Sequence, residues 1–226
     1  MFRNEVLKRI QNCFIDCVEN FTHGKVAEVV KEALNEGLSA LDILENGLNL
    51  ALEVVGERYE REEYFVSDLI IAGQVMKKGV AVLEQALPTE KVEMSGTILI
   101  GTVKDDMHDV GKDIFSTLAR ARGFKIIDLG VDVSADEFVK AVRRNNPDVV
   151  GMSALLNSTM NYIPKVVEAL TKAGLRNGVK IIVGGAPITD SYAKSVGADA
   201  GVNNAVHGVE ICRNWLERER KPSHIY

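Results

Sequence analysis

A histidine flanked by acidic residues lies in a loop between a predicted strand and a predicted helix. Asp106, His108 and Gly111 follow the apolar run at 97–100 and precede a helical pattern from Asp113 to Arg122. A neutral imidazole is a common metal ligand, and a carboxylate at its other ring nitrogen fixes the tautomer and raises its basicity. The spacing therefore predicts that His108 binds a metal and that Asp106 orients it. A surface histidine in a polar loop fits the spacing equally well.

Two physical arguments favour the metal-binding interpretation. Side chains alternate along an extended segment, so Asp106 and His108 are expected on the same side. A histidine just ahead of a helix lies near the positive end of the helix dipole, which disfavours the imidazolium form. The loop's three aspartates and single glycine would repel a phosphate, so a dinucleotide-binding loop is excluded.

The composition is that of a globular chain with two parts of different charge. Hydrophobic residues make up 46% of the 226 residues, which is ample for a packed core. Residues 1–95 hold 10 Lys and Arg against 17 Asp and Glu, whereas residues 96–226 hold 17 against 15. The formal net charge of −5 argues against nucleic-acid binding, and the asymmetry predicts two domains.

The cysteines and the apolar runs indicate the cellular compartment in which the protein is expected. Cys13, Cys17 and Cys212 form no C-x-x-C pair, and buried thiols without a disulfide framework are typical of a cytoplasmic protein. Charged residues interrupt the first ten positions, and no apolar run reaches the roughly 18 residues of a membrane span. We therefore expect a cytoplasmic protein without a signal peptide or membrane segment.

The first part of the chain shows only helical periodicity. Apolar stripes such as Val6, Ile10, Phe14 and Cys17 recur with a period near 3.6 residues. Amphipathic segments joined by short connections predict a small four-helix bundle. We expect a helical domain at 1–88, a polar linker at 89–95 and a second domain at 96–226.

The second part alternates short β-rich runs with helical segments. The runs are at 98–103, 125–129, 149–153, 180–184 and about 199–202. Ser134 opens a capping-box sequence, and Pro164 suits the first turn of a helix. This alternation predicts a doubly wound, five-stranded parallel sheet of the flavodoxin or Rossmann type, with helices on both faces.

The loops that follow such strands meet at one edge of the sheet, where ligands of open α/β sheets bind. Ser153, Asn157 and Thr159 bring polar groups to the loop after the third strand, and Gly184 and Gly185 follow the fourth. An ordinary turn and ordinary helix capping explain these residues as well. Together with His108 they fit a large cofactor with an extended polar tail.

Three short motifs carry a family resemblance. They are D-x-H-x-x-G at 106–111, S-x-L at 153–155 and G-G at 184–185, and residues 54–59, 64–65 and 75–76 match the family's helical cap. On these residues nearly the whole chain resembles the corrinoid-binding proteins of multi-component methyltransferase systems. It is similar also to the cobalamin-binding region of cobalamin-dependent methionine synthase. The chain departs from the family at Ser67, often Pro there, and at 201–204.

The resemblance implies a role for each matching residue. His108 would replace the cofactor's benzimidazole as the lower axial ligand of cobalt, Asp106 would hydrogen-bond it, and Thr159 would continue this relay. Ser153, Leu155, Gly184 and Gly185 would hold the displaced nucleotide tail, and Phe65 would help to cap the methyl-carrying face. The other residues implied to contact the cofactor are Met107, Asp109, Val110, Gly111 and Asn157.

The resemblance also implies a function. The protein would take a methyl group onto cobalt from a substrate-specific methyltransferase and pass it to a second methyltransferase, whose acceptor is tetrahydrofolate or a thiol. A corrinoid-activating reductase would be a third partner, and the chain is not expected to turn over alone. The methyl donor stays open among methylamines, methanol, methoxylated aromatics and betaine-like compounds.

Two other interpretations remain. A cobalamin-binding sensor would need an output module, and no basic helix for DNA binding is present in the sequence. A receiver-like flavodoxin domain without a cofactor could use the acidic loop to bind magnesium, but it would not explain the two other motif loops. A colour test with cobalamin separates this receiver-like domain from both corrinoid-binding interpretations.

Overall fold

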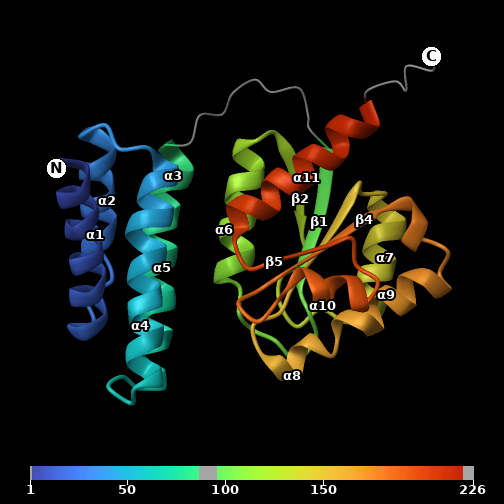
Figure 1. Cartoon of the computed structure of the whole chain (residues 1–226), viewed down its shortest axis with the longest axis horizontal. Coiled ribbons are helices and arrows are strands. Elements are labelled where there is room, and N and C mark those ends of the chain that lie inside the picture. Colours follow the sequence, from blue (N-terminus) through green and yellow to red (C-terminus); the bar gives the residue numbers. More distant parts are fainter. Residues whose placement is uncertain (1, 87–95, 221–226) are drawn as a thin grey trace. The chain divides into compact units, whose positions relative to one another are not determined.

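The chain forms two compact units, Met1–Pro88 and Thr89–Tyr226 (Figure 1). The computed structural model describes residues 2–86 and 96–220, so the linker expected at 89–95 lies outside the described residues. Within these ranges, no helix has the length and apolar character that crossing a membrane requires.

The N-terminal unit is helical throughout its described residues. Its elements are α1 (Phe2–Glu19), α2 (Lys25–Asn35), α3 (Ala40–Asp42), the π-helix η1 (Ile43–Asn49), α4 (Leu50–Glu60) and α5 (Val66–Ala86). Since α3, η1 and α4 follow one another without a break, the unit is the four-helix arrangement predicted from the apolar stripes.

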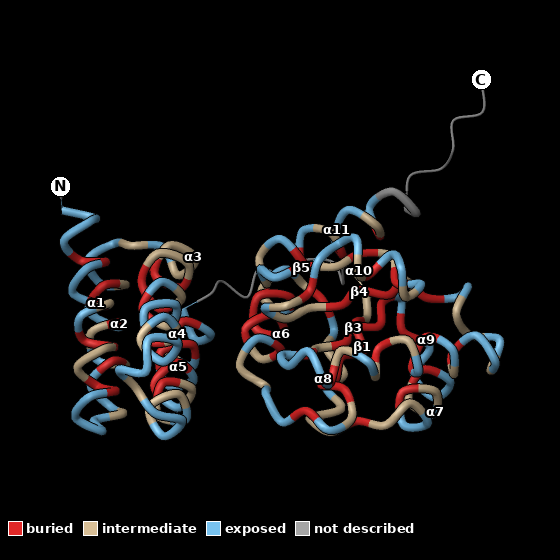
Figure 2. Tube along the Cα trace, turned by 60° about the horizontal axis from the view of Figure 1, so that its bottom comes forward, coloured by how far each residue is buried: buried red, intermediate tan, exposed pale blue. Residues whose placement is uncertain are grey.

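All four helical segments contribute buried apolar residues, and Figure 2 marks the buried positions along the trace in red. Ile10 and Phe14 of α1, Leu48 of η1 and Met76 of α5 are all fully buried. A Cβ added at Gly79 would lie 2.8 Å from Cδ1 of Leu48, so a larger residue in α5 would force the Leu48 side chain to move. The predicted apolar stripes therefore form one shared core.

A side chain of α1 forms a hydrogen bond with the backbone of η1. The side-chain amide of Gln11 in α1 donates a hydrogen bond to the carbonyl oxygen of Asn46 at 2.6 Å. A π-helix is rare and is often found near functional sites, because its widened turn leaves backbone groups in need of other partners. Here Gln11 provides such a partner from 35 residues away.

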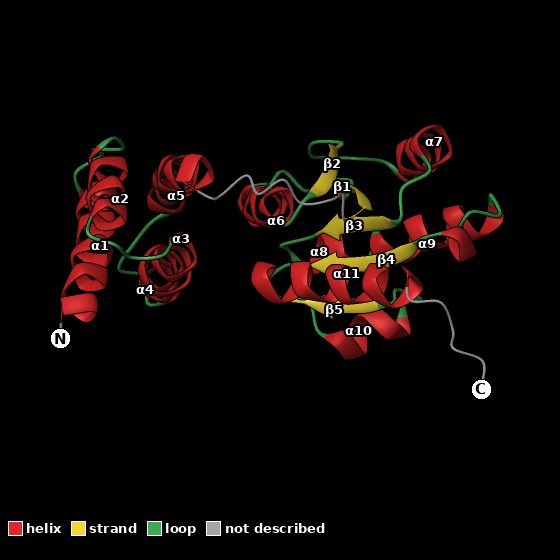
Figure 3. Cartoon of the chain, turned by 90° about the horizontal axis from the view of Figure 1, so that it is seen from above, coloured by secondary structure: helices red, strands yellow, loops and turns green. Residues whose placement is uncertain are grey.

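The C-terminal unit contains a five-stranded parallel sheet, which confirms the predicted fold. The strands are β1 (Gly96–Thr102), β2 (Phe124–Asp128), β3 (Val149–Ser153), β4 (Lys180–Gly184) and β5 (Ala200–Val202). They lie in the order β2-β1-β3-β4-β5, from top to bottom in Figure 3. The chain therefore reverses its winding direction between β1 and β3, which is where ligands bind in such sheets.

Helices cover both faces of this sheet. They are α6 (Val110–Ala121), α7 (Ala135–Asn145), α8 (Asn157–Met160), α9 (Ile163–Lys172), the 3-10 turn η2 (Arg176–Gly178), α10 (Asp190–Ser195) and α11 (Ala205–Arg220). Helix α6 lies on one side of β1, and α7 and α9 lie on the other (Figure 1). Phe138 and Leu170 from those two helices are fully buried in a cluster with Leu99 and Ile181 of the strands.

The strand register places the three motif loops side by side. Thr102 at the end of β1 pairs with Ser153 at the end of β3, and Ser153 pairs with Gly184 at the end of β4. The loops after these strands therefore begin at the same level of the sheet. This alignment brings residues 106, 155 and 185 to one edge, although they are far apart in sequence.

Two expectations about helix boundaries were wrong. Helix α6 begins at Val110 rather than at Asp113, because Asp109 already accepts a hydrogen bond from the backbone N–H of Asp113 at 2.8 Å. The loop expected after β3 contains the short helix α8. The motif residues Val110 and Gly111 thus belong to the first turn of α6.

Replacement of Ser134 by Ala should lower the free energy of unfolding by about 1 kcal/mol. Ser134 forms the predicted capping box: its Oγ accepts from the backbone N–H of Glu137, and its own N–H donates to Glu137 Oε2 at 2.8 Å. Urea unfolding followed by circular dichroism measures the loss. Ser134→Asp, which keeps a capping oxygen, should recover most of it, and equal stability of the Ala variant and wild type would contradict the prediction.

Candidate metal and cofactor site

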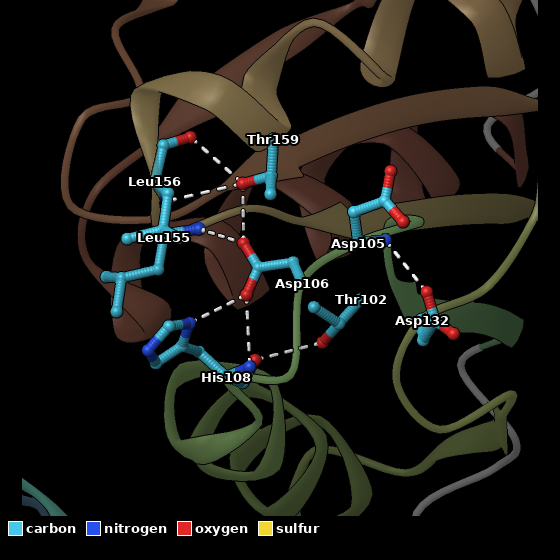
Figure 4. Close-up of polar contacts among 8 residues, drawn as sticks. All are labelled: Thr102, Asp105, Asp106, His108, Asp132, Leu155, Leu156 and Thr159. Atoms are coloured by element: carbon cyan, nitrogen blue, oxygen red, sulfur yellow. Dashed lines mark hydrogen bonds and ion pairs between the residues drawn. The ribbon is translucent and has the colours of Figure 1, made fainter.

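A buried carboxylate organises the loop after β1. The side chain of Asp106 is fully buried and accepts four hydrogen bonds (Figure 4). Its Oδ1 accepts from the backbone N–H of His108 at 3.0 Å and lies 2.7 Å from Nδ1 of the same residue. Its Oδ2 accepts from the backbone N–H of Leu155 at 2.8 Å and from the hydroxyl of Thr159 at 2.6 Å. One side chain therefore joins the loops after β1 and β3.

These donors keep Asp106 ionised. Burial by itself would raise the pKa of this carboxyl, but hydrogen bonds from Thr159, His108 and Leu155 outweigh burial and lower the pKa to about 2. An ionised carboxylate can only accept hydrogen bonds, so Nδ1 of His108 must carry the proton in this contact. The neutral ring then has its lone pair on Nε2.

The imidazole of His108 is held at one nitrogen and open at the other. Half of the side chain is exposed, at 50%. The backbone is fixed as well, because the carbonyl oxygen of His108 accepts from the hydroxyl of Thr102 at 3.0 Å. Since Asp106 occupies Nδ1, Nε2 is the nitrogen that a metal can reach.

The pairing of Asp106 and His108 is present, but its local geometry differs from the expected extended segment. Residues 106–109 have no regular secondary structure, and Asp105 adopts a left-handed conformation with φ of 66°. The aspartate side chain instead accepts from the backbone N–H two residues on, the pattern of an Asx turn. Strand alternation therefore predicted the right pair for the wrong reason.

Thr159 owes its position to the short helix α8. Its Oγ1 accepts from the backbone N–H of Leu156 at 3.3 Å while its proton points to Asp106 Oδ2. Thr159 is buried, whereas Leu155, Leu156 and Asn157 are exposed. The loop after β3 therefore presents two apolar side chains and an amide at the surface, and one hydroxyl to the interior.

The two glycines after β4 serve different purposes. Gly185 has φ of 144°, and a Cβ there would lie 1.9 Å from the carbonyl oxygen of Ala154, so this position tolerates no side chain. At Gly184 a Cβ would meet only Val202, at 3.8 Å or more. Gly185 thus lets the loops after β3 and β4 pack together, whereas a Cβ at Gly184 would make only ordinary van der Waals contact with Val202.

The structure joins some of the predicted site residues and leaves others untested. Hydrogen bonds connect Asp106, His108, Leu155 and Thr159, and Met107 is 68% exposed between the first two. The remaining residues predicted in this unit lie at the ends of β3 and β4, in the loops that follow the strands, and at the starts of α6 and α8: Asp109, Val110, Gly111, Ser153, Asn157, Gly184 and Gly185. Phe65 belongs to the helical unit, so its contact with a cofactor stays a prediction.

Two contributors were missed from the sequence. Leu156 is exposed beside Leu155, and Asp132 contacts the turn that precedes Asp106 from a loop 26 residues away. Leu156 follows the S-x-L motif directly and could have been found by treating the whole loop as one surface. Nothing in the spacing indicates Asp132, because its role depends on a left-handed backbone.

Comparisons with known proteins cover both units of the chain. A family described as the B12 binding domain matches residues 96–210, and a second family with the same description matches residues 10–84. The first match covers the sheet and all three motif loops, and the second covers most of the helical unit.

Similar proteins span nearly the full chain. A corrinoid protein of Desulfitobacterium hafniense is 35% identical over 214 residues, covering 93% of this chain and 97% of that protein. The dimethylamine corrinoid protein of Methanosarcina barkeri is 36% identical over 217 residues, covering 96% and 100%. The solved structure of the Methanosarcina barkeri monomethylamine corrinoid protein superposes with a TM-score of 0.84 at 31% identity, covering 93% and 98%.

Replacement of Thr159 by Val should lower the free energy of unfolding by about 1–3 kcal/mol, because Asp106 would lose a buried donor. Urea unfolding at neutral pH measures the loss, and Thr159→Ser should restore most of it. Because the pKa of Asp106 is depressed in the folded protein, its ionisation stabilises the fold above the ordinary pKa of about 3.9, and this stability is lost as the pH falls toward about 2. The difference in free energy of unfolding between wild type and Thr159→Val should therefore become smaller in acid.

The matched control is Thr171→Val. The Thr171 hydroxyl donates only to the backbone oxygen of Val167 within α9, and the residue is exposed. This change should stay within about 0.5 kcal/mol. Equal effects of the two substitutions would show that the contact between Thr159 and Asp106 contributes nothing beyond an ordinary helix hydroxyl.

Proposed function

The chain belongs to the family of B12-binding corrinoid proteins, and we propose that it carries a methyl group on the cobalt of its bound corrinoid between two methyltransferases. The observation that carries the proposal is the pair formed by Asp106 and His108, in which Nδ1 is occupied and the ring is half exposed. The pair would offer one imidazole nitrogen, Nε2, to a cobalt that the corrinoid itself brings to the site.

His108 would hold the cobalt through Nε2, with Asp106 controlling the strength of that bond. A carboxylate that accepts the proton on Nδ1 increases electron density at Nε2 and makes it a better ligand. When bound, the corrinoid supplies a cobalt atom that takes up and releases the methyl group. Thr159 and the backbone of Leu155 keep Asp106 ionised and oriented during that exchange.

Exposed apolar side chains beside His108 suit a large flat ring. Met107 precedes the histidine, and Leu155 and Leu156 follow the strand whose loop contacts Asp106. Large apolar groups exposed together at one edge of a sheet are typical of a binding surface. These three residues would contact the corrin ring beside His108.

The loops after β3 and β4 would receive the nucleotide tail. Gly184 ends β4 opposite Ser153, Gly185 keeps the two loops in contact, and Ser153 and Asn157 add polar groups near the same edge. Phe65, at the entrance to α5, is 73% exposed in the helical unit, as a residue that covers the methyl-carrying face would need to be. These assignments rest on the motifs and on exposure.

The partners follow from the chemistry. One methyltransferase would supply the methyl group, a second would pass it to tetrahydrofolate or a thiol, and a corrinoid-activating reductase would restore the reduced cobalt, all in the cytoplasm. Relatives named for trimethylamine, dimethylamine and monomethylamine match at 31–36% identity, which supports a small methylated amine as donor. No observation on the described residues favours a sensor.

Histidine ligation predicts a specific nitrogen signature in electron paramagnetic resonance. Protein labelled with 15N-histidine and loaded with cob(II)alamin should show doublet splitting from the axial nitrogen, whereas unlabelled protein should show a triplet. The nuclear spin of the ligating nitrogen sets this pattern, so the label tests whether the nitrogen comes from the protein. A triplet in the labelled protein would assign the ligand to the cofactor's own base.

His108→Ala identifies which histidine is responsible. This variant should stay folded and bind cobalamin without the histidine signature, and its absorption spectrum should differ from that of wild type. His207→Ala is the matched control, because His207 is exposed in the first turn of α11 in the same unit. A His108→Ala spectrum identical to wild type would remove the ligand assignment.

A further inference from the structure

The loop between β2 and α7 lies along the end of β1 and the loop that carries Asp106 and His108, and backbone hydrogen bonds join the two. Thr102 donates through its N–H to Gly130 O at 2.9 Å, and its own carbonyl accepts from the N–H of Val133 at 2.9 Å. Val103 and Val133 form an isolated parallel bridge. Residues 130–133 therefore extend the edge of the sheet to the start of the turn that contains Asp106.

Asp132 contacts this turn through both its side chain and its backbone. Its Oδ1 accepts from the backbone N–H of Asp105 at 2.8 Å, and both of its carboxylate oxygens lie 2.8 Å from Nζ of Lys104. Its own backbone N–H donates to the carbonyl oxygen of Asp106 at 3.0 Å. Figure 4 shows Asp132 beside Asp105, on the other side of Asp106 from His108 and Leu155. Three consecutive residues are thus held by one aspartate.

The backbone is left-handed on both sides of this contact. Asp105 has φ of 66° and Asp132 has φ of 57°, a conformation that is uncommon for residues other than glycine and that aspartate adopts more readily than most. The left-handed turn at Asp105 directs the next side chain, that of Asp106, inward to Leu155 and Thr159. Relaxation of Asp105 would redirect the carboxylate that holds His108.

The ion pair with Lys104 does not account for this arrangement by itself. The side chains of Lys104 and Asp132 are 36% and 41% exposed, and exposed ion pairs contribute little to stability. The two contacts that fix the turn are instead made to its backbone. The side chain of Asp132 accepts from the N–H of Asp105, and the N–H of Asp132 donates to the carbonyl oxygen of Asp106. The position of Asp132 therefore matters more for geometry than for charge.

We propose that Asp132 is a positioning residue for the cobalt ligand: it holds Asp105 left-handed, so that Asp106 stays aimed at Nδ1 of His108. The proposal rests on the proposed function, in which His108 binds cobalt. Loss of the Asp132 side chain lets the turn relax, weakens the hydrogen bond to His108 and so weakens the bond from Nε2 to the metal. Asp132 itself touches neither the imidazole nor the cofactor in this scheme.

Asp132→Gly is the decisive variant, because glycine adopts the left-handed angle freely and only the side chain is removed. In the protein without cofactor, labelled with 15N-histidine, nuclear magnetic resonance reports the proton on Nδ1 of His108. Its exchange with solvent should become about fivefold faster, the factor that corresponds to one hydrogen bond of ordinary net strength. Asp132→Asn, which keeps an oxygen for Asp105, should behave as wild type.

With methylcobalamin bound, absorption spectra give the equilibrium between histidine-on and histidine-off cofactor. Asp132→Gly should shift that equilibrium about fivefold toward histidine-off, and Asp132→Asn should not. Lys104→Met should resemble Asp132→Asn, since it removes the ion pair but leaves the backbone contact. Glu168→Ala is the control, because it deletes an exposed ion pair with Lys172 on α9.

Three outcomes would overturn the proposal. One is a folded Asp132→Gly protein with wild-type exchange and ligation. Another is an Asp132→Asn protein as impaired as Asp132→Gly, which would make charge the cause. The third is loss of folding in Asp132→Gly, which would make Asp132 a general support for the loop. If wild type itself lacks the histidine signature, the proposed function fails first, and the exchange measurement on cofactor-free protein still decides the role of Asp132.

Discussion

The site depends on one buried negative charge that has four donors. Burial of a carboxylate without partners would cost far more than a typical hydrogen bond returns, so the donors to Asp106 must be in place together. They come from two separated stretches of chain: the turn at His108, and the loop that carries Leu155 and Thr159. The pairing of β1 with β3 is what brings those stretches within reach. The pairing of these strands is therefore also what allows Asp106 to orient the imidazole of His108.

Most of the fold could be predicted from the sequence because its signals are local. Strands β3 and β4 have the predicted bounds, and Ser134 and Pro164 lie at helix starts as their chemistry requires. The features that escaped prediction depend on contacts between distant residues. The π-helix η1 has a carbonyl bonded to Gln11 in another helix, and the grip of Asp132 on Asp105 needs two left-handed residues from different loops. Periodicity carries no information about either.

The candidate site shows the same division. The three motifs could be placed at one edge because parallel strands end together, and the register of Thr102, Ser153 and Gly184 agrees. The contact between Asp106 and His108 was expected from alternation along an extended segment, yet an Asx turn produces it. Short motifs therefore indicate which residues meet more reliably than they indicate the backbone that brings them together.

The hydroxyl of Thr159 has a second acceptor within hydrogen-bond distance, and this second acceptor determines how the site would accommodate protonation of Asp106. Its Oγ1 lies 2.9 Å from the carbonyl oxygen of Leu156 as well as 2.6 Å from Asp106 Oδ2. A hydroxyl has one proton and a free rotor, so protonation of Asp106 at Oδ2 would let the hydroxyl turn to Leu156 and accept from the carboxylic acid instead. Asp106 can thus take up a proton while both side chains keep hydrogen-bond partners, because only the direction of the hydrogen bond between Thr159 and Asp106 reverses.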